Sequence, residues 1–147
     1  MSNSRSALIE FLRPFSKTPE ILPDNADLLD LLGLEGDDAS DFMMSFAERF
    51  SIDANGYLWY FHHAEEGANF GGLFFPSPDQ RVERIPITPS ILTEAIETGR
   101  WPLHYPPHDL PNARWDIRFN QVLVVLFLLL SAFLLWQRFG RAALEWF

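Results

Sequence analysis

The chain has 147 residues, of which 48% are hydrophobic and 21% charged, and it contains no cysteine. This length predicts one domain of about 100 to 150 residues with little else. The lack of cysteine excludes disulfide frameworks, thiolate zinc sites and cysteine nucleophiles. The formal net charge of −9 would repel a phosphate backbone, so we expect no nucleic acid among the partners.

Amphipathic helices are predicted at three places in the N-terminal part of the chain. Apolar residues recur at helical spacing over residues 7–15 and, most clearly, over residues 38–50, where Asp37 or Asp38 would cap the helix. A third helix is predicted to begin at Thr88, with Pro89 in its first turn, and to end at Gly99.

An aromatic segment between these helices predicts a small β-sheet. Residues 57–63 are rich in side chains with β propensity, and shorter apolar runs follow at residues 73–75 and 82–87, with a hairpin turn predicted at residues 67–72. The aromatic side chains of residues 57–75 could also line a ligand pocket, which the sequence does not decide. The predicted fold class is α+β, a small mainly helical domain with a short aromatic β insertion and one C-terminal transmembrane helix.

The transmembrane helix is predicted from residues 119–136, which carry no charge. Eighteen helical residues span about 27 Å, close to the roughly 30 Å of a bilayer core. Twelve of the fifteen residues 122–136 are Leu, Val or Phe, and Trp115 and Trp136 lie near the ends of the run, where the membrane interface favours aromatic rings. A buried core helix is the alternative interpretation.

The expected organisation follows from this span. Residues 1–101 form a cytosolic head, 102–118 a proline-rich juxtamembrane linker, 119–137 the transmembrane helix and 138–147 a short tail. The first 15 residues lack the apolar core of a signal peptide. We therefore expect a single-pass, tail-anchored protein of the cell inner membrane, with its N-terminal head in the cytoplasm and lipid contacts through residues 119–137.

Residues 32–37, Leu-Gly-Leu-Glu-Gly-Asp, resemble the modification loop of acyl carrier proteins, and the predicted helix that follows resembles their second helix. A carrier presents Leu-Gly-Leu-Asp-Ser-Leu, whose serine bears phosphopantetheine, and Gly36 stands at the position of that serine. Over residues 30–118, four motifs resemble a bacterial family of small acyl-carrier-like proteins of unknown function: Gly36-Asp37-Asp38-Ala39, Trp59-Tyr60-Phe61-His62-His63, Gly71-Gly72-Leu73-Phe74-Phe75 and Gly99-Arg100-Trp101-Pro102. The resemblance implies an acyl-carrier-like head.

The candidate interaction site is an acidic ridge, defined as Asp37, Asp41, Ser45 and Glu48. These residues recur every three or four positions and so share the outer face of the helix over residues 38–50. In acyl carriers, which this segment resembles, such a ridge is where basic partner surfaces dock. We expect a non-enzymatic membrane protein whose acidic head docks a protein partner with a basic surface.

Three alternatives remain open at the level of sequence. The first is an unorthodox acyl carrier that uses a nearby serine, Ser40 or Ser45. The second is a small metal-dependent hydrolase that uses His62, His63 and Glu65, although adjacent residues of a strand would point to opposite faces. The third is an acidic, immunity-type protein that neutralises a basic toxin. No nucleophile elbow, phosphate loop or dinucleotide fingerprint is present, so we assign no catalytic, cofactor-binding or metal residue.

Overall fold

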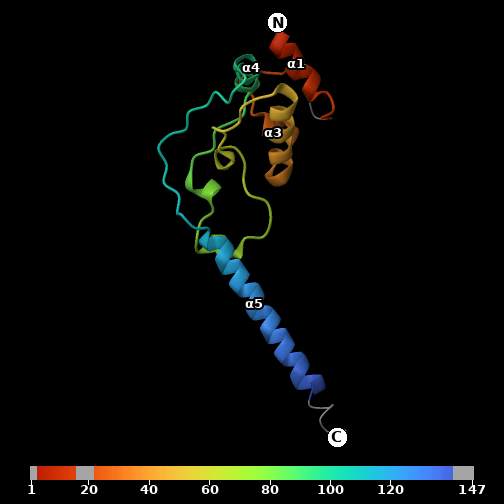
Figure 1. Cartoon of the computed structure of the whole chain (residues 1–147), viewed down its shortest axis with the longest axis vertical. Coiled ribbons are helices and arrows are strands. Elements are labelled where there is room, and N and C mark those ends of the chain that lie inside the picture. The colour runs from red at the N-terminus through yellow and green to blue at the C-terminus, as the bar shows by residue number, and fades with distance from the viewer. Residues whose placement is uncertain (1–2, 16–21, 141–147) are drawn as a thin grey trace. The chain divides into compact units, whose positions relative to one another are not determined.

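A computed structural model of the chain describes residues 3–15 and 22–140 (Figure 1). The chain divides into two compact units. Unit 1 consists of Met1–Gly67 and Pro78–Leu110, and unit 2 consists of Ala68–Ser77 and Pro111–Phe147.

Unit 1 is helical and is built around one hydrophobic core. Its helices are α1 (Asn3–Leu12), α2 (Leu28–Leu32), α3 (Gly36–Phe50) and α4 (Pro89–Thr98). Each turns its apolar stripe inward, so that Leu8, Leu29, Phe46 and Leu92 are almost completely buried. The aromatic ring of Phe11 on α1 packs against three rings of α3, with centroids 5.5 to 5.8 Å apart.

The ends of these helices test the predicted caps. The prediction for α4 is confirmed, because the Thr88 side chain accepts a hydrogen bond from the Ile91 amide and Gly99 ends the helix in a left-handed conformation. The predicted cap of α3 is wrong. Its N-cap residue is Glu35, which makes no side-chain capping bond, and Asp37 and Asp38 lie in the first turn. There their carboxylates face the positive end of the helix dipole, which favours the same residue types.

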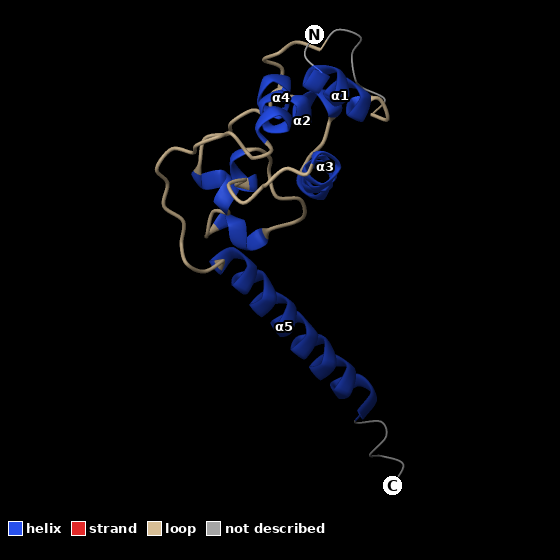
Figure 2. Cartoon of the chain, turned by 45° about the horizontal axis from the view of Figure 1, so that its top comes forward, coloured by secondary structure: helices blue, strands red, loops and turns tan. Residues whose placement is uncertain are grey.

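The described residues contain no β-strand, so the predicted aromatic β insertion is not supported (Figure 2). Over residues 57–63 the chain forms a 3₁₀ turn, η1 (Trp59–Phe61), because the amides of Phe61 and His62 bond back to Leu58 and Trp59 instead of to a neighbouring strand. Only an isolated bridge pairs Asp53 with Arg100 in the described part of the chain. The mainly helical character is confirmed.

The predicted hairpin turn and the other predicted strands are also not found as such in the described residues. Residues 67–72 contribute to η2 (Phe70–Leu73), and η3 (Pro78–Arg81) precedes an extended segment. In this segment the Ile85 amide bonds to the Phe61 carbonyl and the Ile87 carbonyl accepts from Leu28, on a different element. Pro86 interrupts the segment and has no amide proton to donate, so no regular ladder forms.

Unit 2 contains the long helix α5 (Trp115–Leu135), which continues into a π-helical turn, η4 (Trp136–Gly140). Twenty-one α-helical residues span about 31 Å. Among the described residues, one helix, Trp115–Phe139, is long and apolar enough to cross a membrane, and its apolar side chains lie exposed on the surface of the chain. Residues 141–147 of the expected tail lie outside the described residues.

Candidate functional site

The acidic ridge lies on α3, on the face opposite the core. Asp37, Asp41, Ser45 and Glu48 are all exposed, whereas Phe42 and Phe46 on the other side of the helix are buried. The structure therefore brings the four predicted residues onto one accessible surface.

The carboxylates of the ridge are not neutralised within the part of the chain that the structure describes. No ion pair is found there for Asp37, Asp41 or Glu48. The neighbouring acidic cluster behaves differently, because Arg84 lies 2.7 to 3.5 Å from three of its carboxylates: Asp27, Asp30 and Glu35. Partial burial raises the pKa of Asp27 despite this arginine. Arg84 thus forms ion pairs with that cluster, and the negative charge of the ridge is available to a partner.

A polar hollow of about 250 Å³ lies at the N-terminal end of the ridge. Three carboxylates contribute to its lining, those of Asp37, Glu65 and Glu66, and Trp59 forms part of its wall. The imidazole of His63 also lines the hollow, and its Nε2 atom is buried without a hydrogen-bond partner among the described residues. Since Asp37 belongs to both features, the hollow, which we call the acidic hollow, is continuous with the ridge.

The position of Gly36 requires glycine. Its φ of +52° is a left-handed conformation that side chains disfavour, and a Cβ atom there would collide with the side chain of Glu66. The nearby Ser40 hydroxyl bonds to the Gly36 carbonyl at 3.2 Å, within the helix, whereas Ser45 is exposed on the ridge. Both serines are thus residues of α3 and lie outside the loop that precedes this helix.

His62 is the centre of a buried hydrogen-bond network. The Tyr105 hydroxyl accepts bonds from the Leu58 amide at 3.2 Å and from the Trp101 indole at 2.8 Å, so its own proton is donated to His62 Nε2 at 2.7 Å. The Nδ1 atom of His62 then donates to the Ile85 carbonyl at 2.7 Å. Each ring nitrogen thus makes one hydrogen bond, Nδ1 as donor and Nε2 as acceptor, which is the pattern of a neutral imidazole.

Burial sets the electrostatics of this network. Burial lowers the pKa of His62 to about 4, although the hydrogen bond to Ile85 acts in the opposite direction. Burial also raises the pKa of Tyr105. His63 lies next in the chain, and its imidazole Nδ1 bonds to the adjacent Ala64 carbonyl at 3.1 Å. Among the residues that the structure describes, no group of three or more His, Asp or Glu side chains is placed to hold a metal ion.

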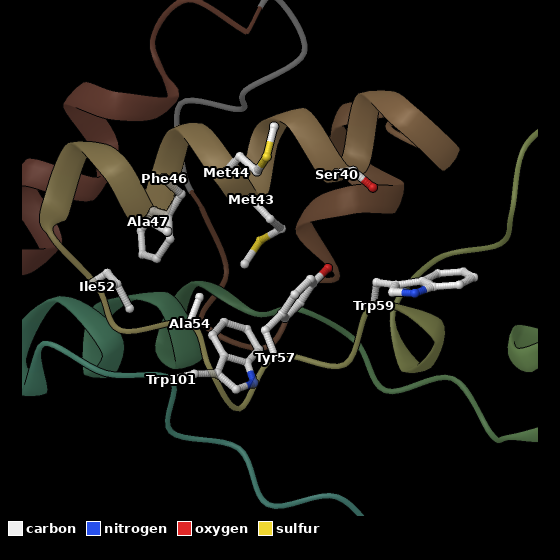
Figure 3. Close-up of a pocket in the computed structure, with 10 residues that line it drawn as sticks. All are labelled: Ser40, Met43, Met44, Phe46, Ala47, Ile52, Ala54, Tyr57, Trp59 and Trp101. Carbon is white, nitrogen blue, oxygen red and sulfur yellow. The ribbon is translucent and has the colours of Figure 1, made fainter. Parts of the chain in front are cut away.

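Figure 3 shows a second, apolar pocket between α3 and residues 52–59. Its volume is about 270 Å³, and its lining contains no charged side chain: Ser40, Met43, Met44, Phe46, Ala47, Ile52, Ala54, Tyr57, Trp59 and Trp101. The Tyr57 hydroxyl points toward α3 beside Met43 (Figure 3). It is buried and has no hydrogen-bond partner in the part of the chain that the structure describes. Burial raises the pKa of Tyr57, which keeps this hydroxyl a donor.

The aromatic segment therefore does contribute to a pocket, but sequence reasoning missed its partners. Trp101, which lines the pocket, lies more than 40 residues after Tyr57 in the chain. Tyr105, which bonds to His62, also lies more than 40 residues from its partner and falls in the proline-rich segment expected to be a linker. The tyrosine ring stacks on Phe61 with centroids 4.7 Å apart. The available signal was the large aromatic content of residues 101–105, which a solvated linker does not need.

The chain matches no protein-family model, no curated protein and no solved structure.

Proposed function

We propose that the protein is a non-enzymatic, single-pass membrane protein whose acidic head docks a protein partner that has a basic surface. The observation that carries this proposal is the acidic ridge, in which three exposed carboxylates on one helical face have no ion-pair partner among residues 3–15 and 22–140. Unneutralised carboxylates in one row attract a complementary basic surface, raise its association rate and fix its register.

The acidic hollow supplies the specific part of this interaction. A lysine or arginine side chain that enters it meets the carboxylates of Asp37 and Glu66, and its aliphatic stem can lie against Trp59. The unpaired Nε2 atom of His63 offers a buried acceptor close by. A row of charges beside a hollow favours a partner that presents several basic residues, one of them projecting.

The membrane part of the proposal depends on α5. Its apolar run is exposed and long enough to span a bilayer, and three arginines precede it within about 20 residues, Arg100, Arg114 and Arg118, against Arg138 and Arg141 after it. This bias favours a cytoplasmic head at the inner membrane. Because the chain lacks cysteine, one engineered cysteine in the head and a membrane-impermeant maleimide can test the orientation in intact spheroplasts and inverted vesicles.

Docking is tested by charge reversal on the full chain. Asp37→Lys, Asp41→Lys and Glu48→Lys together change the formal charge by six units, from −9 to −3. A control with the same net charge reverses three exposed carboxylates elsewhere: Glu94→Lys, Glu97→Lys and Asp109→Lys. Proteins crosslinked to each form in membranes are then identified.

A partner is expected among the proteins that both wild type and control capture. The ridge variant should recover it at least about tenfold less efficiently, and added salt should weaken capture by the wild type. If ridge and control variants lose the same proteins to the same extent, only net charge matters and the ridge is not a docking site.

Membrane insertion is tested in the full chain as well. Val125→Arg and Leu129→Arg place two charges in the middle of the apolar run, at a cost of about 5 to 7 kcal/mol. Val125→Ile and Leu129→Ile serve as the control. The wild type and control should resist alkaline carbonate extraction and the arginine variant should not, whereas extraction of all three would contradict the membrane span.

A second candidate function is favoured by the Tyr57 hydroxyl. We infer that the apolar pocket binds a small, uncharged, mainly apolar molecule that has one hydrogen-bond acceptor, such as a carbonyl oxygen. An apolar cavity of 150 Å³ holds benzene, so 270 Å³ accommodates about ten non-hydrogen atoms. The Ser40 hydroxyl and the Trp101 indole already donate to protein acceptors, whereas the buried Tyr57 hydroxyl gains its first bond from the ligand.

Acetophenone and cumene test this inference, because both have nine non-hydrogen atoms and differ by a carbonyl oxygen. The chain has three methionines, Met1, Met43 and Met44. In full-length protein labelled with ¹³C-methyl methionine, acetophenone should shift the resonances of Met43 and Met44, which line the pocket.

The role of the hydroxyl is tested by removing it. Tyr57→Phe should weaken acetophenone binding about fivefold to tenfold, the value of one hydrogen bond, and should not weaken cumene binding. Tyr60→Phe is the control, because its hydroxyl bonds to the exposed His108 at 2.8 Å, outside the pocket. Unshifted Met43 and Met44 methyls would refute the pocket, and equal affinity of Tyr57→Phe for acetophenone would refute the hydrogen bond.

A further inference from the structure

Residues 69–75 of unit 2 carry an exposed apolar surface beside the start of α5. Relative exposures are 65% for Phe70, 80% for Leu73 and 67% for Phe74. Outside α5 and η4, the other exposed large hydrophobic side chains of the described residues are only Phe75 and Met44. Residues 67–78 also carry no charge. Such a concentration of apolar surface marks a site of contact with an apolar phase or partner.

This loop, which we call the apolar loop (residues 69–75), is tied to the first turns of α5 by a complete hydrogen-bond network. The Asn69 side chain donates to Asp116 Oδ2 at 2.9 Å and accepts from the Asn120 side chain at 2.9 Å. The amide of Gly71 donates to Asn120 Oδ1 at 2.7 Å. Arg114 completes the network with two bonds to the Asp116 carboxylate, at 3.0 and 2.6 Å.

The packing of the loop on α5 is equally close. A Cβ atom at Gly71 would collide with the backbone of Asp116, so glycine is needed for this approach. The rings of Phe74 and Phe75 pack on Phe119, with centroids 5.3 and 6.2 Å apart. Both η2 and the start of α5 lie side by side in Figures 1 and 2.

The position of Phe119 decides which apolar phase covers the loop. Phe119 is the first residue of the uncharged run, so the lipid that surrounds this run begins at the ring that Phe74 and Phe75 contact. The exposed surface of the loop is thus continuous with the exposed surface of the apolar helix. Burial of an unpaired polar group near the acyl chains costs free energy. The Asp116 carboxylate and the Asn120 amide avoid this cost because both are hydrogen-bonded within the network.

We propose that the apolar loop is a second membrane contact, which inserts Phe70, Leu73 and Phe74 into the lipid interface and fixes the depth and rotation of α5. This proposal rests on the proposed membrane span of α5. The expected partner is a lipid surface, because aromatic and aliphatic side chains with few charges favour the boundary between headgroups and acyl chains.

Spin labels on the cysteine-free full chain test the proposal. Single variants Leu73→Cys, Leu128→Cys and Glu97→Cys are labelled with a nitroxide and reconstituted into phosphatidylcholine vesicles. Collision with oxygen, which concentrates in lipid, is compared with collision with a water-soluble nickel complex. The oxygen-to-nickel ratio should exceed one at positions 73 and 128 and fall below one at position 97, on the exposed face of α4.

Each other outcome is decisive. If the label at position 128 reports lipid and the label at position 73 reports water, the loop is not a membrane contact although α5 spans the bilayer. If the label at position 128 also reports water, the membrane span itself is refuted and the loop proposal falls with it. Asn69→Ala should lower the ratio at position 73 and leave it unchanged at 128, because it removes two of the three side-chain-mediated bonds that hold the loop to α5 and leaves only the bond from the Gly71 amide to Asn120.

Discussion

Acidification provides a direct test of the buried His62 network. In the unfolded chain this histidine has a pKa of 6.5, whereas in the folded protein burial lowers its pKa to about 4. Between these two values the unfolded chain binds a proton that the folded chain does not bind. The contribution of His62 to the free energy of unfolding is therefore fully present above pH 6.5 and is lost progressively as the pH falls toward 4.

The magnitude follows from the size of the shift. Each pKa unit is worth about 1.4 kcal/mol, so the full loss is about 3 kcal/mol, of which about 2 kcal/mol is lost between pH 8 and pH 5. Other groups titrate in the same range. The test is consequently a comparison of the wild type with His62→Gln, which lacks the titrating ring.

The assay is urea-induced unfolding of the full chain in dodecylmaltoside micelles, followed by near-ultraviolet circular dichroism of the aromatic residues. The wild type should lose about 2 kcal/mol more than His62→Gln between pH 8 and pH 5. ¹⁵N shifts of the imidazole should show a neutral ring that is protonated at Nδ1. Parallel pH profiles of the two proteins would refute the buried neutral histidine.

Three further substitutions test other parts of the structure. Tyr105→Phe should lower the free energy of unfolding by about 2 to 4 kcal/mol in the same urea assay, because it leaves the Leu58 amide, the Trp101 indole and His62 Nε2 unpaired. Gly36→Ala should lower the free energy of unfolding by about 1 to 3 kcal/mol, more than Gly99→Ala does. Both glycines have a positive φ, but a Cβ atom would collide with a neighbouring side chain, that of Glu66, only at Gly36. Equal effects of the two substitutions would show that Glu66 moves aside. Asn69→Ala should speed hydrogen exchange of the Gly71 and Gly72 amides, measured by NMR, since it removes the side-chain acceptor of Gly72, which keeps only the Asn69 carbonyl, and removes the bond that holds the Asn120 side chain, the acceptor of Gly71.

Local patterns explain why the helices and the ridge could be predicted. The apolar stripe of α3 and the Thr88, Pro89 and Gly99 signals of α4 act within a few residues, so the chain needs no distant partner to express them. The same periodicity places Asp37, Asp41 and Glu48 on one outer face. The long apolar run of α5 is likewise a property of composition and length.

Tertiary contacts decided the rest. Residues 57–63 have the composition of a strand, but a strand needs a neighbour with free amides and carbonyls in register, and the segment instead bonds locally and to Ile85 and Tyr105. The polar and apolar pockets and the apolar loop also join residues that lie far apart in the chain, such as Ser40 with Glu66, Met43 with Trp101 and Asn69 with Asp116. Sequence periodicity reports which face of an element is apolar, whereas only the packed chain determines what that face contacts.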